Sequence, residues 1–176
     1  AFAKEHGAKA AASLADLGKA VDAVVTMLPT GREVRDALFT MQGGALAANL
    51  KPGAVVIDMS SADAVGTGAL GAELAARKLV LVDAPVSGGV PRARDGSLAI
   101  MIGGDPDAVA RAKPVLACMG SKLFDVGSLG CGHAMKCLNN FLAGTSFAAA
   151  AEAVTVGRKF GLDPKVMIDV INVSTG

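Results

Sequence analysis

The amino-acid sequence predicts an α/β fold, in which a mostly parallel sheet is followed by a long helix that opens an all-α domain. Short apolar runs recur as far as Gly127, and segments with helical spacing lie between them, so strands alternate with helices. Residues 132–160 differ, because they contain no proline and are rich in alanine, and Gly161 then marks the end of one long helix. We therefore expect an α/β domain over residues 1–129 and the start of a helical domain over 130–176.

Five apolar runs are expected to be strands. A continuous apolar run is typical of a strand that is buried on both faces of a parallel sheet. In chain order, the runs lie at 22–29, 54–60, 79–85, 97–104 and 121–127.

The starts of three helices are marked by capping residues. Thr30 and Glu33 have the spacing of a capping box, which predicts a helix that begins near Gly31. Asp105 and Asp163 are each followed by a proline, which is favoured at the first position of a helix.

The composition is that of a folded protein and excludes several classes of partner. Apolar residues make up 52% of the 176 residues and charged residues 19%. The net charge is +1 and only 3% of residues are aromatic, so we expect no nucleic-acid partner and no anionic membrane surface. No uncharged apolar run reaches the roughly 18 residues that a membrane span requires.

The cysteines indicate a reducing compartment. The chain has 3 cysteines, Cys118, Cys131 and Cys137, without the C-x-x-C spacing of a zinc site. We expect reduced thiols, no bound metal and a cytoplasmic protein, since the first residues also lack the apolar region of a signal peptide.

One glycine-rich stretch suggests a dinucleotide-binding loop. GTGALG at 66–71 fits G-x-G-x-x-G, and Asp83 follows at about the spacing of a ribose-binding acid. A phosphate-binding glycine, however, directly follows its strand, whereas residues 60–65 intervene here. Ser60 or Ser61 is expected to cap a helix at this point, with Asp63 in its first turn. The residues alone leave both interpretations open.

Four longer segments carry a resemblance to a known family. They are TMLPT at 26–30, IDMSS at 57–61, DAPVSGGVPRARDGSLAIMIGG at 83–104 and GCGHAMKCLNN at 130–140. Together they resemble the β-hydroxyacid dehydrogenase family over nearly the whole chain. The resemblance implies a Rossmann-type domain whose phosphate-binding glycines precede the first residue of this chain. It also implies that GTGALG lies within a helix and that Asp83 begins a substrate loop.

The resemblance implies reversible oxidation of a short 3-hydroxy acid, such as 3-hydroxyisobutyrate, by a nicotinamide cofactor. Lys136 matches the family's catalytic lysine, and a general acid or base must lie within hydrogen-bond reach of the reacting hydroxyl. Asn140 matches its asparagine partner and lies four residues on, on the same face of the expected helix. His133 has helical spacing toward Lys136, but a single histidine near a helix start is expected to be structural.

Two further groups of site residues follow from the resemblance. The substrate carboxylate is expected to bind at Ser87, Gly88 and Gly89, since glycines let backbone N–H groups approach an anion closely. The cofactor is expected to contact Met27, Leu28, Pro29 and Ser61. The cofactor is NAD, with NADP not excluded, because the residues that discriminate between them precede this chain.

The sequence leaves the substrate and the oligomeric state open. Tartronate semialdehyde or a related short semialdehyde is an alternative substrate, although Asn140 favours 3-hydroxyisobutyrate. A non-catalytic relative that serves as an interaction module is the alternative from another class, and the presence of Lys136 speaks against it. The alanine-rich helix predicts close helix packing and a homo-oligomer.

Overall fold

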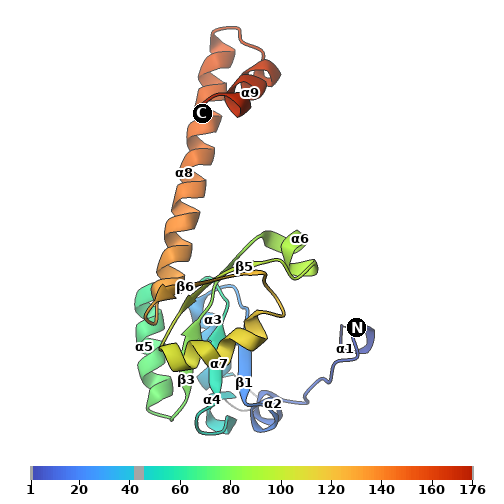
Figure 1. Ribbon diagram of the computed structural model, residues 1–176, viewed down its shortest axis with the longest axis vertical. Coiled ribbons are helices and arrows are strands. Elements are labelled where there is room, and N and C mark those ends of the chain that lie inside the picture. Colours follow the sequence, from blue (N-terminus) through green and yellow to red (C-terminus); the bar gives the residue numbers. More distant parts are fainter. Residues whose placement is uncertain (1, 42–45, 176) are drawn as a thin grey trace. The chain divides into compact units, whose positions relative to one another are not determined.

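A computed structural model describes residues 2–41 and 46–175 (Figure 1). The chain forms two compact units, Ala1–Lys136 and Cys137–Gly176. The predicted domain division at 129/130 stays a prediction. The strands are β1 (Ala23–Thr26), β2 (Val55–Asp58), β3 (Val80–Asp83), β4 (Val86–Ser87), β5 (Ala99–Gly103) and β6 (Lys122–Gly127). The helices are α1 (Phe2–Glu5), α2 (Leu14–Ala20), α3 (Gly31–Phe39), α4 (Leu46–Asn49), α5 (Ala64–Ala75), α6 (Gly89–Arg94), α7 (Pro106–Leu116), α8 (Cys131–Lys159) and α9 (Pro164–Val173).

The first unit is built on a six-stranded sheet with the order β1-β2-β3-β5-β4, in which β6 pairs with β5. The pairs β1–β2, β2–β3 and β5–β6 are parallel, which confirms the predicted α/β class with a mostly parallel sheet. Thr26 pairs with Asp58, and Asp58 pairs with Asp83. The first three strands therefore end level with one another, at one edge of the sheet.

The stretch after β3, which the resemblance implies to be a substrate loop, contains a short strand and a short helix. Ser87 lies in β4 and pairs in antiparallel register with Ala99 of β5, and α6 begins at Gly89. Strand β5 also pairs antiparallel with β3, at Gly103 and Asp83. The short β4 therefore fixes the backbone of this segment against the sheet.

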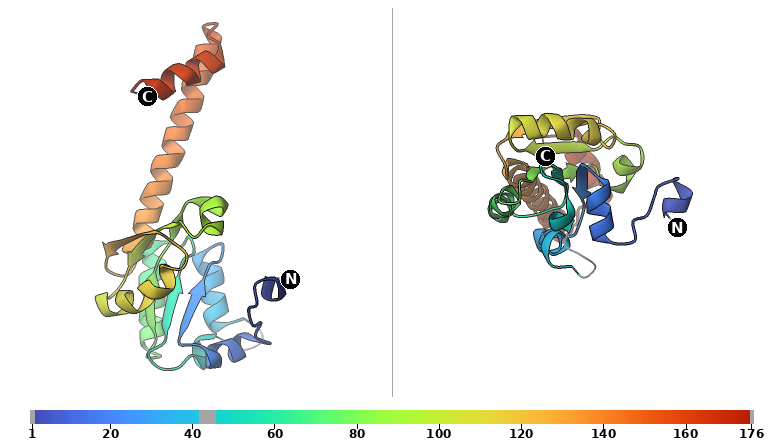
Figure 2. Two further views of the ribbon diagram at one scale, coloured as in Figure 1. Left: turned by 45° about the vertical axis from the view of Figure 1, so that its right-hand side comes forward. Right: turned by 90° about the horizontal axis from the view of Figure 1, so that it is seen from below.

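Two apolar clusters cover opposite faces of the sheet. The face toward α3, α4 and α5 carries Val56, while the face toward α7 carries Val55 and Ile57 of the same strand (Figure 2). This alternation explains why β2 is buried along its full length, as predicted. The prediction is wrong for β1, whose Val25 is 39% exposed, because β1 is the outermost strand at its end of the sheet order.

The helix caps mostly match the sequence prediction. Thr30, Asp105 and Asp163 each accept a hydrogen bond from the first turn of α3, α7 and α9, respectively. The cap of α5 is Asp63, not Ser60 or Ser61. The reason is that the Ser60 hydroxyl accepts from the Leu28 N–H at 2.9 Å, and α5 begins only at Ala64, after Asp63 in an extended conformation.

Helix α8 has 29 residues and ends one residue before the predicted limit. Gly161 follows it with φ of 86°, a left-handed conformation that ends a helix. Among the described residues, no helix combines the length and the apolar character that crossing a lipid bilayer requires.

Candidate active site

Three segments leave the sheet together at the carboxyl ends of β1, β2 and β3. The Met59 N–H donates to the Thr26 carbonyl at 2.8 Å, and the Ala84 N–H donates to the Asp58 carbonyl at 2.7 Å. The Leu28–Ser60 hydrogen bond also connects the first two segments. Ligands of open α/β sheets bind at this edge.

The predicted cofactor residues lie along this edge. Met27 is 61% exposed, and Pro29 and Ser61 are also exposed, so all three side chains are accessible to a ligand. Leu28 is half-buried and packs against the apolar cluster of α3 and α5. Leu28 therefore serves mainly to hold Met27 and Pro29 in place at the edge of the sheet.

The predicted substrate segment carries unusual backbone geometry. Gly88 has φ of 134° and Gly89 has φ of 64°, which residues with side chains rarely adopt. A Cβ atom on Gly88 would lie 2.5 Å from the side chain of Arg92. Ser87 is half-buried. Glycines are therefore required at these positions by the local fold, whether or not a ligand binds.

Lys136 and Asn140 both lie in α8. Lys136 is half-buried and is the last residue of the first compact unit. Asn140 is exposed and belongs to the second unit. Their roles in binding or catalysis stay predictions.

A buried polar cluster, which sequence reasoning did not find, joins the strand ends to the start of α8. The Asp83 carboxylate accepts from the N–H groups of Gly130 and His133, each at 2.8 Å. A carboxylate is favoured at this position because the first N–H groups of a helix are unpaired and positively polarised. His133 itself is buried, in keeping with its expected structural role. The sequence carries one sign of this cluster, because the apolar runs at 54–60 and 79–85 each contain an acid near their end, Asp58 and Asp83.

The first turn of α8 approaches the sheet so closely that only glycine fits at Gly132. A Cβ atom there would lie 2.5 Å from the Met101 carbonyl oxygen and 2.8 Å from Oδ2 of Asp83. Close backbone approach, more than turn geometry, explains this glycine.

GTGALG lies inside α5, as the family resemblance implies. The Gly66 N–H already donates a hydrogen bond to the Asp63 carboxylate, at 2.6 Å. Thr67 and Leu70 are buried against the rest of the domain. An acidic cap occupies the helix start where a phosphate would have to bind, so this motif has the wrong electrostatics for a pyrophosphate.

Glu33, at the start of α3, has a perturbed acidity. The Thr30 hydroxyl donates to its carboxylate and, as the largest cause, lowers the pKa of Glu33 below its ordinary value. Thr30 and Glu33 pair as the predicted capping-box spacing requires, but the Thr30 hydroxyl accepts from the Arg32 N–H and donates to the Glu33 carboxylate, and this pairing accounts for Glu33 without a ligand.

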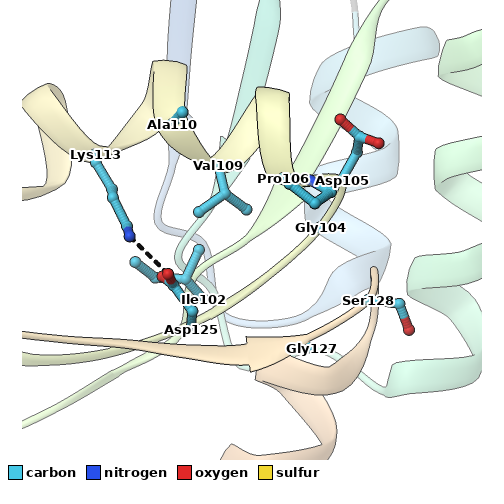
Figure 3. A pocket seen from close by; sticks show the side chains of 10 residues that line it. All are labelled: Ile102, Gly104, Asp105, Pro106, Val109, Ala110, Lys113, Asp125, Gly127 and Ser128. Carbon is cyan, nitrogen blue, oxygen red and sulfur yellow. Dashed lines mark hydrogen bonds and ion pairs between the residues drawn. The ribbon is translucent and has the colours of Figure 1, made fainter.

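A sizeable cavity lies elsewhere in the first unit. It has about 740 Å³ and is bounded by α7 and by the ends of β5 and β6, with Lys113 and Asp125 paired at 2.6 Å (Figure 3). None of the predicted site residues lines it. A smaller cavity of about 280 Å³ lies between the starts of α3 and α5 and is lined in part by Asp58 and Thr67.

Among the described residues, no group of His, Cys, Asp and Glu side chains is arranged to hold a metal ion.

Two family profiles cover nearly the whole chain. Residues 1–127 match the profile of the NAD binding domain of 6-phosphogluconate dehydrogenase. Residues 130–176 match the profile described as NAD-binding of NADP-dependent 3-hydroxyisobutyrate dehydrogenase. Fold and profiles define a Rossmann-type NAD-binding protein that continues into a helical segment. The chain belongs to the β-hydroxyacid dehydrogenase family, which confirms the resemblance inferred from the sequence.

Named relatives show the same affiliation. Over 98% of its length, the chain is 38% identical to the human mitochondrial 3-hydroxyisobutyrate dehydrogenase and 38% identical to L-threonate dehydrogenase of Cupriavidus necator. It covers 51% and 58% of these two relatives. The solved structure of Mycobacterium tuberculosis 3-hydroxyisobutyrate dehydrogenase with L-serine is 35% identical and superposes with a TM-score of 0.89, over 99% of this chain and 58% of that one. The chain thus spans little more than half the length of these relatives.

Proposed function

We propose that the protein is an NAD(P)-dependent 3-hydroxyacid dehydrogenase that oxidises 3-hydroxyisobutyrate to methylmalonate semialdehyde. The observation that carries the proposal is the position of Lys136. This lysine lies in α8, and the N–H groups at the start of α8 donate to the carboxylate of Asp83, at the end of β3. Ligands of this fold bind at that edge of the sheet. Several relatives are 3-hydroxyisobutyrate dehydrogenases by name, which supports the substrate.

The residues at the sheet edge fit a dinucleotide. Exposed Met27 and Pro29 offer an apolar surface, and exposed Ser61 offers a hydroxyl, as an adenosine and a ribose require. When bound, the nicotinamide ring accepts the hydride from the carbinol carbon. The family profiles name both NAD and NADP, and we propose NAD, with NADP as the alternative.

In the proposed mechanism the protein holds the hydroxy acid and moves one proton. Ser87 and the backbone N–H groups of Gly88 and Gly89 bind the substrate carboxylate. The neutral Lys136 amine takes the hydroxyl proton as the alcohol is oxidised and returns it in the reverse direction. Asn140 binds the hydroxyl or orients the amine.

Other substrates remain as alternatives. The L-threonate dehydrogenase relative is as similar to the chain as the human protein, so a larger hydroxy acid is the main competitor. Tartronate semialdehyde or a related short semialdehyde is the second. A purely non-catalytic interaction module is disfavoured because Lys136, Asn140 and the glycine segment are all present.

We also propose that the protein is a cytoplasmic homo-oligomer. The alanine-rich helix α8 supports the homo-oligomer, because small side chains allow helices of two copies to pack closely. Sedimentation equilibrium of the full-length protein tests this, and a monomer at all concentrations would contradict it.

The test of the activity is steady-state kinetics of the full-length protein with 3-hydroxyisobutyrate, L-threonate and glycerate, which is the reduced form of tartronate semialdehyde, each with NAD and with NADP. The proposal expects the highest kcat/KM for 3-hydroxyisobutyrate with NAD. A higher kcat/KM for L-threonate would replace the substrate but keep the class, whereas no turnover of any hydroxy acid would refute the class.

A further inference from the structure

Helix α8 begins without a side-chain cap of its own. Its first residue is Cys131, so the position before it, where a side chain ordinarily accepts from the first free N–H groups, is Gly130, which has no side chain. The Cys131 N–H donates to the Ser128 carbonyl at 3.0 Å, but the N–H groups of Gly130 and His133 donate outside their own segment. The helix that carries Lys136 therefore depends on a distant partner for its first turn.

Asp83, at the end of β3, is that partner and uses both of its side-chain oxygens. Oδ1 accepts from the Gly130 N–H and Oδ2 accepts from the His133 N–H, each at 2.8 Å. A capping box satisfies the same two N–H groups with two side chains, one at the residue before the helix and one at the third helical position. One residue, 47 and 50 positions away from the two donors, thus replaces both halves of a capping box.

Two glycines leave room for this contact. A Cβ atom on Gly132 would lie 2.8 Å from Oδ2 of Asp83. A Cβ atom on Gly103, the β5 residue that pairs with Asp83, would lie 2.5 Å from Oδ1. The Asp83 side chain is also completely buried. Contacts this close leave the start of α8 little freedom to shift against β3.

The chain between Asp83 and the proposed substrate segment is held at successive positions. The Ala84 N–H donates to the end of β2 at 2.7 Å, and the Pro85 carbonyl accepts from β5 at 3.0 Å. Ser87 is then paired with β5. On the other side, Lys136 lies about one turn of α8 beyond the second of the bonded N–H groups. Asp83 is thus a common anchor of the substrate segment and of the helix turn that carries the lysine.

We propose that Asp83 is a positioning residue for the reaction: by capping α8 from the end of β3, it holds Lys136 at a fixed place relative to Ser87. Asp83 is buried, so its effect on the reaction passes through Lys136 and not through a contact with the substrate. The positioning role rests on the proposed function of Lys136. The capping of α8 does not, because it follows from the two hydrogen bonds.

The capping is tested in the unsubstituted full-length protein by amide hydrogen exchange. We expect the N–H groups of Gly130 and His133 to exchange at least about a hundredfold more slowly than in an unstructured peptide, since both are bonded to a buried side chain. The reference is the Arg32 N–H at the start of α3, which is bonded to an exposed hydroxyl and should exchange much faster. Exchange of the two α8 groups at the rate of Arg32 would overturn the proposal.

The positioning is tested by the kinetics of Asp83→Asn in the full-length enzyme. Asparagine offers one acceptor oxygen where Asp83 uses two, so one bond to α8 is lost. We expect kcat to fall at least about tenfold while the dissociation constant of the cofactor changes less than about twofold, because Lys136 is misplaced but the cofactor residues are not. Asp83→Thr, which also keeps one acceptor and suits a strand, takes its place if Asp83→Asn does not fold. An unchanged kcat in either folded variant would refute positioning.

The matched control is Asp105→Asn. Asp105 also caps a helix, α7, but its Oδ1 alone accepts from the N–H groups of Asp107 and Ala108, at 3.0 and 3.4 Å. Asparagine can make the same two bonds, and α7 carries no proposed site residue, so kcat should stay within about twofold of wild type. A loss of kcat as large as that of Asp83→Asn would contradict a specific role of Asp83.

A double-mutant cycle decides whether Asp83 acts through Lys136. In a Lys136→Met background, Asp83→Asn should change kcat less than about twofold, because the group that Asp83 positions is already absent. A loss as large as in the wild-type background would mean that Asp83 acts through another group, and would overturn the proposal. If Lys136→Met alone left kcat unchanged, the proposed function and the positioning role would both fail, while the capping of α8 would stand.

Discussion

Two glycine-rich stretches of this chain invite comparison, and the more familiar pattern is the less important one. GTGALG at 66–71 fits the sequence of a phosphate-binding loop, yet it lies inside α5 behind an acidic cap. Gly130–Cys131–Gly132 fits no nucleotide motif, yet it allows the first turn of α8 to lie directly against the strand ends. The comparison shows that the role of a glycine depends on its place in the fold, here the close approach of α8 to the strand ends, and not on its spacing to other glycines.

The sharpest stability test of this comparison is Gly132→Ala. The added Cβ would meet backbone atoms of Met101 and Asp83 at under 3.0 Å, and backbone cannot move aside cheaply. We expect a loss of about 3 kcal/mol in the free energy of unfolding, at the upper end for overpacking. Chemical denaturation measures it, and a loss below about 1 kcal/mol would show that α8 is less tightly seated than we describe.

A smaller effect is expected for Ser87→Ala in the full-length enzyme. A hydroxyl that binds the substrate carboxylate contributes equally in the ground state and the transition state. KM for the hydroxy acid should therefore rise about tenfold, with kcat nearly unchanged. Initial-rate measurements decide this, and a large loss of kcat at constant KM would place Ser87 in the chemistry itself.

The counterpart to Gly132→Ala is Gly68→Ala in GTGALG. A Cβ on Gly68 meets nothing within 4 Å, and alanine is favoured over glycine inside a helix. The variant should be more stable by about 0.5–1 kcal/mol, with unchanged cofactor affinity in the full-length protein. Thermal unfolding and a cofactor titration check both parts, and a loss of cofactor binding would restore GTGALG as a phosphate loop.

The smallest effect concerns acid stability at the start of α3. The pKa of Glu33 is lowered in the folded chain by the Thr30 hydroxyl, so its contribution is present above the unfolded pKa and is lost as pH falls through the folded one. In Thr30→Val, the pKa of Glu33 should rise toward its ordinary value. Carboxyl ¹³C titration measures this directly. A Glu33 titration identical in both proteins would mean that the Thr30–Glu33 bond does not form in solution.

Much of the fold could be predicted because its signals are local. Asp105 and Asp163 with their prolines set the starts of α7 and α9, and Gly161 sets the end of α8. The start of α5 was misplaced because Ser60 is a good cap by type, but its hydroxyl is already used by Leu28, a residue far away in the sequence.

The parts that sequence could not reveal depend on distant pairings. Ser87 pairs with Ala99 across a turn and a short helix, so the antiparallel β4 has no local signature. The contact between Asp83 and His133 joins residues 50 positions apart. Lys136 and the glycine segment were found only through the family resemblance, since a lysine in a helix and two adjacent glycines are ordinary features by themselves.

The most direct test of the account compares Lys136→Met with Gly68→Ala in the full-length enzyme, by steady-state kinetics with 3-hydroxyisobutyrate and circular dichroism. Methionine keeps helix propensity and the apolar stem but cannot transfer a proton. We predict that Lys136→Met lowers kcat by roughly 10²–10⁴-fold in a folded protein, while Gly68→Ala stays within about twofold of wild type. A folded Lys136→Met enzyme with near-normal kcat, beside a Gly68→Ala enzyme that has lost activity, would contradict the account.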